Sequence, residues 1–182
     1  LEEHPEYAFI GRSNVGKSSL INMLTETTLA KISSTPGKTQ LINHYLVNNN
    51  WFLVDLPGYG YAKTSKKNRK EFNLFSKEYL TKSTRLRCIF LLIDIRIKPQ
   101  KNDMEFINWL GAEKLPFIRV FSKTDKLTNH KISSAIKKHN NLLLKSWESA
   151  PKYIISSSKN KTGRMEILDE ITKINTLKAN HS

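Results

Sequence analysis

Eight residues near the start of the chain have the types and spacing of a loop that binds phosphate. Gly11 to Ser18 read G-R-S-N-V-G-K-S and fit the pattern G-x-x-x-x-G-K-[ST]. Glycines let the backbone fold tightly, so that successive N–H groups face phosphate oxygens, and the following helix adds the positive end of its dipole. Lys17 would then contact the outer phosphates, and Ser18 would give its hydroxyl oxygen to Mg²⁺. The pattern predicts a phosphate site with a bound magnesium ion.

A second motif, Asp55-Leu56-Pro57-Gly58, follows an apolar run. A carboxylate at Asp55 could orient a metal-bound water, and the N–H of Gly58 could meet a terminal phosphate. Taken alone, an Asp-Pro-Gly turn at the end of a strand is ordinary. Its position after the phosphate loop makes it a candidate part of the same site.

Two further motifs point to the base of a nucleotide. In Ser122-Lys123-Thr124-Asp125, the carboxylate of Asp125 can accept hydrogen bonds from the N1–H and N2 amine of guanine, whereas adenine has an acceptor in place of N1–H. The stem of Lys123 would lie along the base plane, and backbone N–H groups of Ser156-Ser157-Ser158 could meet the guanine oxygen. Each segment alone could be a polar turn. In this order, the four motifs together predict a GTPase.

The segments between the motifs alternate apolar runs with amphipathic stretches, which is typical of an α/β fold with a mostly parallel sheet and helices on both faces. We expect six strands, at Tyr7–Ile10, Gln40–Val47, Trp51–Asp55, Cys88–Asp94, Pro116–Phe121 and Tyr153–Ser156. We expect helices at Lys17–Leu24, Lys66–Leu80, Lys101–Ala112, Lys131–Ser146 and Arg164–Ile174. The second and third strands, separated by three asparagines, are expected to be antiparallel.

Each motif then lies at the carboxyl end of a predicted strand, where open α/β sheets bind their ligands. We expect one domain over residues 1–175 and a frayed polar tail over residues 176–182.

The composition limits the possible partners. Among 182 residues, 30 are Lys or Arg and 16 are Asp or Glu, giving a net charge of +14. Such an excess favours a polyanion, most often nucleic acid. The apolar runs are too short to cross a bilayer, and the single cysteine, Cys88, gives no sign of an oxidising compartment. We expect a cytoplasmic monomer without a membrane partner.

Three segments together resemble a known family. Gly11–Ser18, Ser34–Leu41 (S-T-P-G-K-T-Q-L) and Asp55–Lys63 (D-L-P-G-Y-G-Y-A-K) are similar to the EngB (YihA/YsxC) family of bacterial GTP-binding proteins, within the TrmE-Era-EngA-EngB-Septin-like GTPases. The resemblance covers nearly the whole chain. It implies a Ras-like P-loop G domain that binds GTP or GDP and Mg²⁺, and that acts with ribosomal RNA or a precursor in assembling the large ribosomal subunit.

The resemblance also assigns roles to residues. Thr39 would join Ser18 on Mg²⁺, and the catalytic set would be Lys17, Thr39, Asp55 and Gly58. The residues expected at GTP lie in the matched motifs and are Gly11, Arg12, Ser13, Asn14, Val15, Gly16, Lys17, Ser18, Ser19, Gly37, Lys38, Thr39, Gln40, Leu41, Asp55, Leu56, Pro57, Gly58, Ser122, Lys123, Thr124, Asp125, Ile155, Ser156 and Ser157.

The sequence departs from related GTPases at two positions. Tyr59 stands where Ras-like enzymes have a water-positioning glutamine, so we expect slow hydrolysis. Ser122 replaces the usual Thr or Asn and keeps a hydroxyl, so base specificity should survive with weaker affinity. Asn14 matches the position at which similar GTPases without the glutamine bind a monovalent cation, which implies K⁺ as a further cofactor. For Arg12, a solvated position is favoured over a phosphate contact.

Lys63, Lys66, Lys67, Arg69 and Lys70 form a basic run after the second motif. It is either a solvated helix face or an RNA footprint that moves with the nucleotide. A second, less specific basic set is Lys131, Lys137, Lys138 and Lys145. Two other functions compete with a ribosome-directed switch: an RNA-binding module with incidental hydrolysis, and a nucleotide kinase. Against the kinase stand the missing arginine-rich lid and the guanine motif.

Overall fold

The computed structural model describes residues 4–25, 29–32, 42–59 and 66–179, with the side chains of residues 29–32, 66–73 and 178–179 left aside. Seven strands form one sheet: β1 Glu6–Gly11, β2 Leu29–Ile32, β3 Asn43–Val47, β4 Trp51–Asp55, β5 Leu86–Asp94, β6 Phe117–Ser122 and β7 Tyr153–Ile155. The helices are α1 Lys17–Leu24, α2 Lys66–Lys82, α3 Lys101–Ala112, α4 Asn129–Leu143 and α5 Arg164–Ala179, with one 3₁₀ turn at Thr124–Lys126.

The strand order is β2-β3-β4-β1-β5-β6-β7, and only β3 runs against the others in this sheet of described residues. The predicted α/β class and the predicted antiparallel hairpin of β3 and β4 are therefore confirmed. The expected count of six strands was one too few. The additional strand, β2, has four residues and pairs with β3 alone, so its partner is set by tertiary contact that no local pattern reveals.

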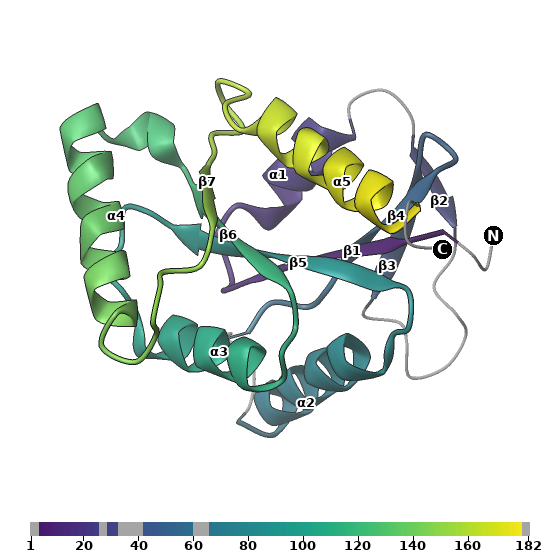
Figure 1. Cartoon of the computed structure of the whole chain (residues 1–182), viewed down its shortest axis with the longest axis horizontal. Helices are drawn as coiled ribbons and strands as arrows, with labels where there is room; N and C mark the ends of the chain where they lie inside the picture. Colours follow the sequence, from purple (N-terminus) through teal and green to yellow (C-terminus); the bar gives the residue numbers. More distant parts are fainter. Residues whose placement is uncertain (1–3, 26–28, 33–41, 60–65, 180–182) are drawn as a thin grey trace.

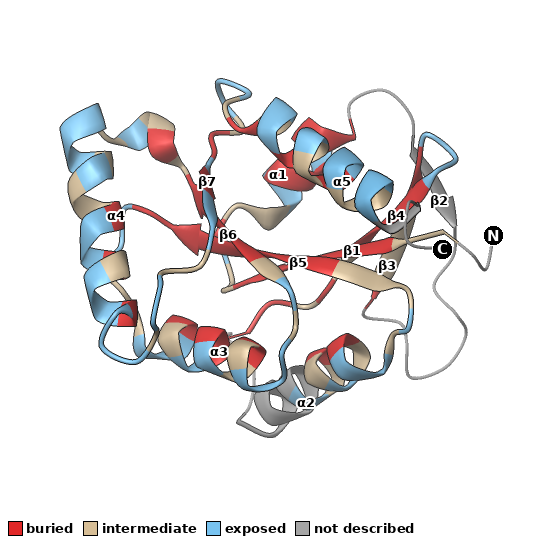
Figure 2. Cartoon of the chain, in the orientation of Figure 1, coloured by how far each residue is buried: buried red, intermediate tan, exposed pale blue. Residues whose placement is uncertain are grey.

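Helices cover both faces of the sheet (Figure 1). Helices α1 and α5 pack on one face through Leu20, Ile21, Ile167 and Ile171. On the other face α2, α3 and α4 pack through Leu80, Ile107, Leu110 and Leu143. The central strands β1 and β5 are buried between these layers, as their continuous apolar runs predicted (Figure 2).

The ends of several elements differ from the expected ones. Helix α4 begins at Asn129, because Thr128 accepts a hydrogen bond from the backbone of Lys131 and caps the helix two residues early. It ends at Leu143, before the predicted end at Ser146. Helix α5 continues to Ala179, so residues 176–179 of the expected tail are helical. None of the described helices is long and apolar enough to cross a membrane.

Candidate functional site

The phosphate loop connects β1 directly to α1, as the motif requires. Gly11 ends β1 where a Cβ atom would lie 2.7 Å from the carbonyl oxygen of Leu92, so only glycine fits. Asn14 and Gly16 have positive φ angles of 63° and 99°, which turn the chain sharply before the helix. A cavity of about 460 Å³ lies over the loop and is lined by residues 12–19 with Gly58 and Lys123.

The first turn of α1 is open to an anion. Gly16 is its N-cap residue and has no side chain to cap the helix, and no acidic residue lies in the first turn. The N–H groups at the start of a helix lack intrahelical partners, and the helix dipole makes this end positive. Ser18 is exposed in this turn, beside the cavity. The arrangement therefore offers donors and a hydroxyl oxygen to a phosphate group and its cation.

Lys17 and Asp55 bring the first two motifs together. The ammonium group of Lys17 donates a hydrogen bond to the carboxylate of Asp55, which ends β4. Both side chains are mostly buried, and burial lowers the pKa of Lys17 to about 8. Phosphate oxygens placed over the loop would compete with Asp55 for this ammonium, since both are anions.

Gly58 lies against the phosphate loop. A Cβ atom there would be 2.7 Å from the carbonyl oxygen of Gly11, so the close approach depends on glycine. The next residue fixes this position: the Tyr59 N–H donates to Gly11 at 3.1 Å, and the Ser13 N–H donates to the Tyr59 carbonyl at 3.3 Å. The backbone of the second motif is thus hydrogen-bonded to the first.

The side chain of Tyr59 points into the core instead of toward the cavity. It is 5% exposed and stacks on Phe106 of α3, with ring centroids 4.8 Å apart. Its hydroxyl donates to Asp103 of α3 at 3.0 Å. Burial raises the pKa of Asp103, whereas the Tyr59 hydrogen bond and the charge of Arg12 lower it. The residue at the glutamine position is therefore anchored to α3 and does not line the phosphate cavity.

Arg12 differs from the expectation of a solvated side chain. It is half-buried, and its Nε atom is buried without a hydrogen bond to any described residue. Its charge acts on both Tyr59 and Asp103, so the guanidinium lies near this pair. A side chain read from sequence as surface charge therefore lies close enough to a buried carboxyl group to act on its pKa.

The base motif is attached to the phosphate loop by two side chains. The Ser122 hydroxyl donates to the Val15 carbonyl at 2.6 Å. Lys123, whose φ is 63°, donates from Nζ to the Asn14 carbonyl at 2.5 Å and lies 3.0 Å from a carboxylate oxygen of Asp94. A serine is therefore long enough to make the connection between β6 and the loop.

Asp125 is held by the loop that follows β7. The Ser157 hydroxyl donates to its carboxylate at 2.8 Å, and this bond together with Lys126 lowers the pKa of Asp125. Thr124 donates from both its N–H and its hydroxyl to the Ser156 carbonyl. The side chain of Ile155 is exposed, and the Ser156 hydroxyl makes no hydrogen bond within the described chain. Asp125 is thus ionised and positioned as a hydrogen-bond acceptor.

Two functional candidates were missed from sequence. Asp94, at the carboxyl end of β5, pairs with both Lys123 and Arg96, and Asp103 holds Tyr59. The position of Asp94 at the end of the most apolar strand could have marked it as a site residue. Nothing in the sequence around Asp103 could have done so. Five expected GTP contacts lie outside the described residues: Gly37, Lys38, Thr39, Gln40 and Leu41. The side chains of the basic run from Lys63 to Lys70 do so as well.

Comparisons with known proteins agree with this geometry. A protein-family model described as 50S ribosome-binding GTPase matches residues 6–123. A probable GTP-binding protein EngB from Christiangramia forsetii is 56% identical over 172 residues, which cover 94% of this chain and 87% of that protein. Another from Phocaeicola vulgatus is 54% identical over 177 residues, covering 96% and 88%.

A solved structure supports the fold. The crystal structure of a probable GTP-binding protein EngB superposes with a TM-score of 0.71 at 23% identity, covering 93% of this chain and 97% of that one. The family match spans the phosphate loop, Asp55 and Gly58, and reaches Lys123 of the base motif. With relatives more than half identical over nearly the whole chain, this protein belongs to the EngB family of GTP-binding GTPases.

Proposed function

We propose that this protein binds GTP and GDP at the carboxyl edge of its sheet, hydrolyses GTP slowly, and uses the two states to bind and leave an assembling large ribosomal subunit. The observation that carries this proposal is the attachment of the base motif to the phosphate loop. Ser122 and Lys123 both donate to loop carbonyls, so the phosphate donors and Asp125 are held in one rigid arrangement. Such an arrangement suits a guanine nucleotide rather than a phosphate alone.

Magnesium fits the oxygen donors of this site. Ser18 is exposed at the start of α1, beside Lys17 and Asp55, and hydroxyl and phosphate oxygens are the ligands that Mg²⁺ prefers. We assign the ion to Ser18 and Thr39, with Thr39 resting on the family resemblance because it lies outside the described residues. When bound, Mg²⁺ would neutralise charge on the phosphate oxygens.

The environment of Tyr59 supports the proposal of slow hydrolysis. Its hydroxyl is bound to Asp103 and its ring to Phe106, so it cannot orient an attacking water without leaving the core. Removing a water-positioning group from related enzymes leaves turnover slow until a partner supplies it. The same observation supports the second candidate function, an RNA-binding module in which hydrolysis is incidental.

The ribosomal partner is supported by two facts. The matching family model is described as a 50S ribosome-binding GTPase, and the chain carries a net charge of +14. Charge of this sign and size favours the phosphate backbone of RNA. A cytoplasmic location, a monomeric state and the lack of a membrane partner are consistent with this role. We include all three in the proposal.

The first test is a fluorescent-nucleotide titration with GTP and ATP as competitors. If Asp125 pairs with guanine, GTP should bind at least tenfold more tightly, because adenine leaves the carboxylate unpaired at a cost of about 2 kcal/mol or more. Equal affinities would contradict the guanine assignment.

The second test is cosedimentation with large ribosomal subunits in GDP and GTP-analogue states, combined with turnover measured with and without subunits. A switch should cosediment differently in the two states and should be accelerated by the subunit. Nucleotide-dependent RNA binding without acceleration would favour the RNA-binding module instead.

A third test concerns potassium. Asn14 is exposed at the turn of the loop and lines the phosphate cavity, where a side-chain amide oxygen would meet a cation beside the phosphates. We expect hydrolysis to be faster in K⁺ than in Na⁺, and Asn14→Ala to remove the difference. Identical rates in the two salts at matched ionic strength would remove K⁺ from the proposal.

A further inference from the structure

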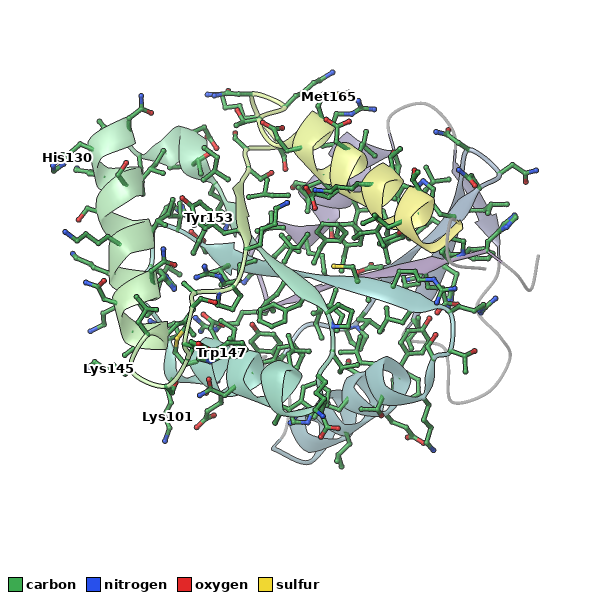
Figure 3. The ribbon with its side chains drawn as sticks, viewed as in Figure 1. Lys101, His130, Lys145, Trp147, Tyr153 and Met165 are labelled. Carbon is green, nitrogen blue, oxygen red and sulfur yellow. The ribbon has the colours of Figure 1, made fainter. Side chains whose placement is uncertain are left out.

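A groove separate from the phosphate cavity lies between helix α4 and the loop that follows β5. It has a volume of about 490 Å³, which is within the range of pockets that hold small ligands. Its lining is apolar at Ile95, Leu127 and Ala135. Helix α4 stands at one end of the molecule, and His130 at its start also lines the groove (Figure 3).

The rim of the groove is strongly basic. Arg96 and Lys98 line it from the loop, and Lys131 and Lys138 line it from α4. All four are exposed, and of the described residues that line the groove none is Asp or Glu. Arg96 is fixed by a two-point contact with Asp94, at 2.9 Å and 2.8 Å, so at least one of these cations is held in place. The groove therefore attracts an anion.

A buried histidine lines the same groove. His139 is 1% exposed, and neither ring nitrogen makes a hydrogen bond that meets normal geometry with a described residue. Burial and the charge of Arg119 lower the pKa of His139 to about 4, while the nearby backbone of Ile97 acts in the opposite direction. The ring is neutral at physiological pH and carries one donor and one acceptor. Buried polar atoms without partners are rare and call for a ligand or another explanation.

Arg119 adds positive potential beneath this histidine. It is fully buried and bonds only neutral groups among the described residues, namely Asn140 and the carbonyl of Pro151. Its guanidinium lies over the rings of Phe121 and Tyr153. Burial lowers the pKa of Arg119 to about 10, so it stays charged at neutral pH. A buried cation without a carboxylate partner strengthens the attraction of the groove for anions.

We propose that this groove binds single-stranded RNA, with backbone phosphates on Lys98, Lys131 and Lys138 and the edge of one nucleobase on His139. The inference rests on the proposed function and gives its RNA partner a location. An extended polyanion is favoured over a short acidic peptide because Lys137 and Lys145 continue the positive charge along α4 and beyond its end. A neutral imidazole donates or accepts one hydrogen bond at the ring nitrogen that faces the groove, and the edge of an unstacked base offers groups of both kinds.

The groove is connected to the base side of the nucleotide site. Asp94 binds Arg96 on the groove rim and Lys123 in the base motif. Because GDP and GTP carry the same base, RNA binding in the groove should not depend on the γ-phosphate. This distinguishes the groove from the basic run at the start of α2, whose binding would change between the two nucleotide states.

The experiment compares two charge-reversal variants with equal change in net charge. Lys131→Glu/Lys138→Glu alters the groove, and Lys159→Glu/Lys173→Glu alters two exposed lysines that do not line it. Binding is followed by fluorescence anisotropy with a labelled single-stranded RNA of mixed sequence. We expect the groove variant to bind about tenfold more weakly at moderate salt, and its salt slope to fall by roughly 1.4, because two phosphate contacts on a single strand are lost. The control should change by less than twofold.

His139→Leu and His139→Gln separate a ligand role from a structural one. If the histidine is only a core residue, Leu should raise stability and leave RNA affinity unchanged. We expect instead that Leu keeps or raises stability and lowers RNA affinity about fivefold, while Gln, which retains a donor and an acceptor, restores part of it.

Equal RNA affinity in the groove and control variants would overturn the inference. So would tighter binding of an acidic peptide than of RNA at the same groove. GTP affinity and cosedimentation with ribosomal subunits, measured on the same variants, keep the two proposals apart. If wild-type protein cosediments with subunits in no nucleotide state, the proposed function is contradicted. The RNA titration still tests whether the groove binds RNA.

Discussion

Polar groups have different surroundings at the two edges of the sheet, the amino edge where the parallel strands begin and the carboxyl edge where they end. At the amino edge, the carboxylate of Glu6 is buried and held by neighbouring side chains: Tyr79 and Ser83 donate to one oxygen at 2.5 Å and 2.6 Å, and Arg85 forms an ion pair with the other at 2.5 Å. At the carboxyl edge, the first turn of α1 has no side-chain cap, and Lys17 holds its charge against burial. A carboxylate held by several side chains at one edge indicates a structural role, and a helix start without a side-chain cap at the other indicates a ligand.

This difference predicts that changes at the amino edge alter stability without altering nucleotide affinity. Glu6→Ala should lower the free energy of unfolding by about 2–4 kcal/mol, because it leaves donors from α2 and from the turn between α2 and β5 without their common acceptor. Urea denaturation measures the change. Glu105→Ala, which removes an exposed helical ion pair with Lys101, is the matched control and should cost less than about 0.5 kcal/mol. Equal effects of the two would mean that the Glu6 cluster is no more than a surface pair.

At Asp125 we expect the opposite result, a change in nucleotide affinity with little change in stability. Asp125→Asn should weaken GTP binding on the order of a hundredfold, corresponding to about 2–3 kcal/mol, and should favour xanthine nucleotides, which present an acceptor where guanine has a donor. The Ser157 bond can be kept by the amide oxygen, so unfolding should change little. Asp169→Asn, on the exposed face of α5, serves as the control. A large loss of stability with unchanged base preference would make Asp125 a structural residue.

Local sequence patterns predicted the carboxyl edge better than the amino edge. The strand Trp51–Asp55 and the helices Lys17–Leu24 and Lys101–Ala112 match the structure at both ends, because turn residues and apolar spacing agree there. The phosphate loop is a local motif whose chemistry is contained in eight consecutive residues.

What the sequence could not predict depends on distant segments. Glu6 meets Tyr79 and Ser83 only after the sheet and α2 assemble, and the strand Leu29–Ile32 is defined by its pairing with β3. Tyr59 and Asp103 were likewise unconnected in sequence, since one follows a motif and the other lies within an amphipathic helix. Arg12 looked solvated for the same reason: its neighbours come from α3.

Tyr59 lies between the two kinds of region, since its backbone belongs to the nucleotide site and its side chain to the core. Tyr59→Phe keeps the stacking on Phe106 but removes the only hydroxyl bound to Asp103 among the described residues, and should cost about 1–2 kcal/mol. Burial already raises the pKa of Asp103, and losing the Tyr59 hydrogen bond raises it further. The loss of stability should therefore shrink as pH falls, because a protonated carboxyl group needs no donor.

Thermal unfolding of this variant between pH 5 and pH 8 tests that dependence, with Tyr153→Phe as a control at an exposed tyrosine. GTP affinity and the basal hydrolysis rate should stay close to wild type, because the phenol does not line the phosphate cavity. A variant that loses nucleotide binding would place the Tyr59 side chain in the site.

The smallest expected effect is a pH dependence of nucleotide affinity from Lys17. Burial lowers the pKa of Lys17 to about 8 in the free protein, whereas phosphate oxygens beside the ammonium would raise it in the complex. Affinity should be constant below pH 7 and fall as pH rises through 8, because binding must then take up a proton. Between pH 7 and pH 8.5 the charged fraction of Lys17 falls by about fourfold, and GDP affinity should fall by the same factor. Lys17→Arg remains charged across this range, so its weaker binding should be flat with pH. If wild type and Lys17→Arg show the same slope, the proton comes from the nucleotide or another residue, and the contrast between the two edges would rest on the open helix terminus alone.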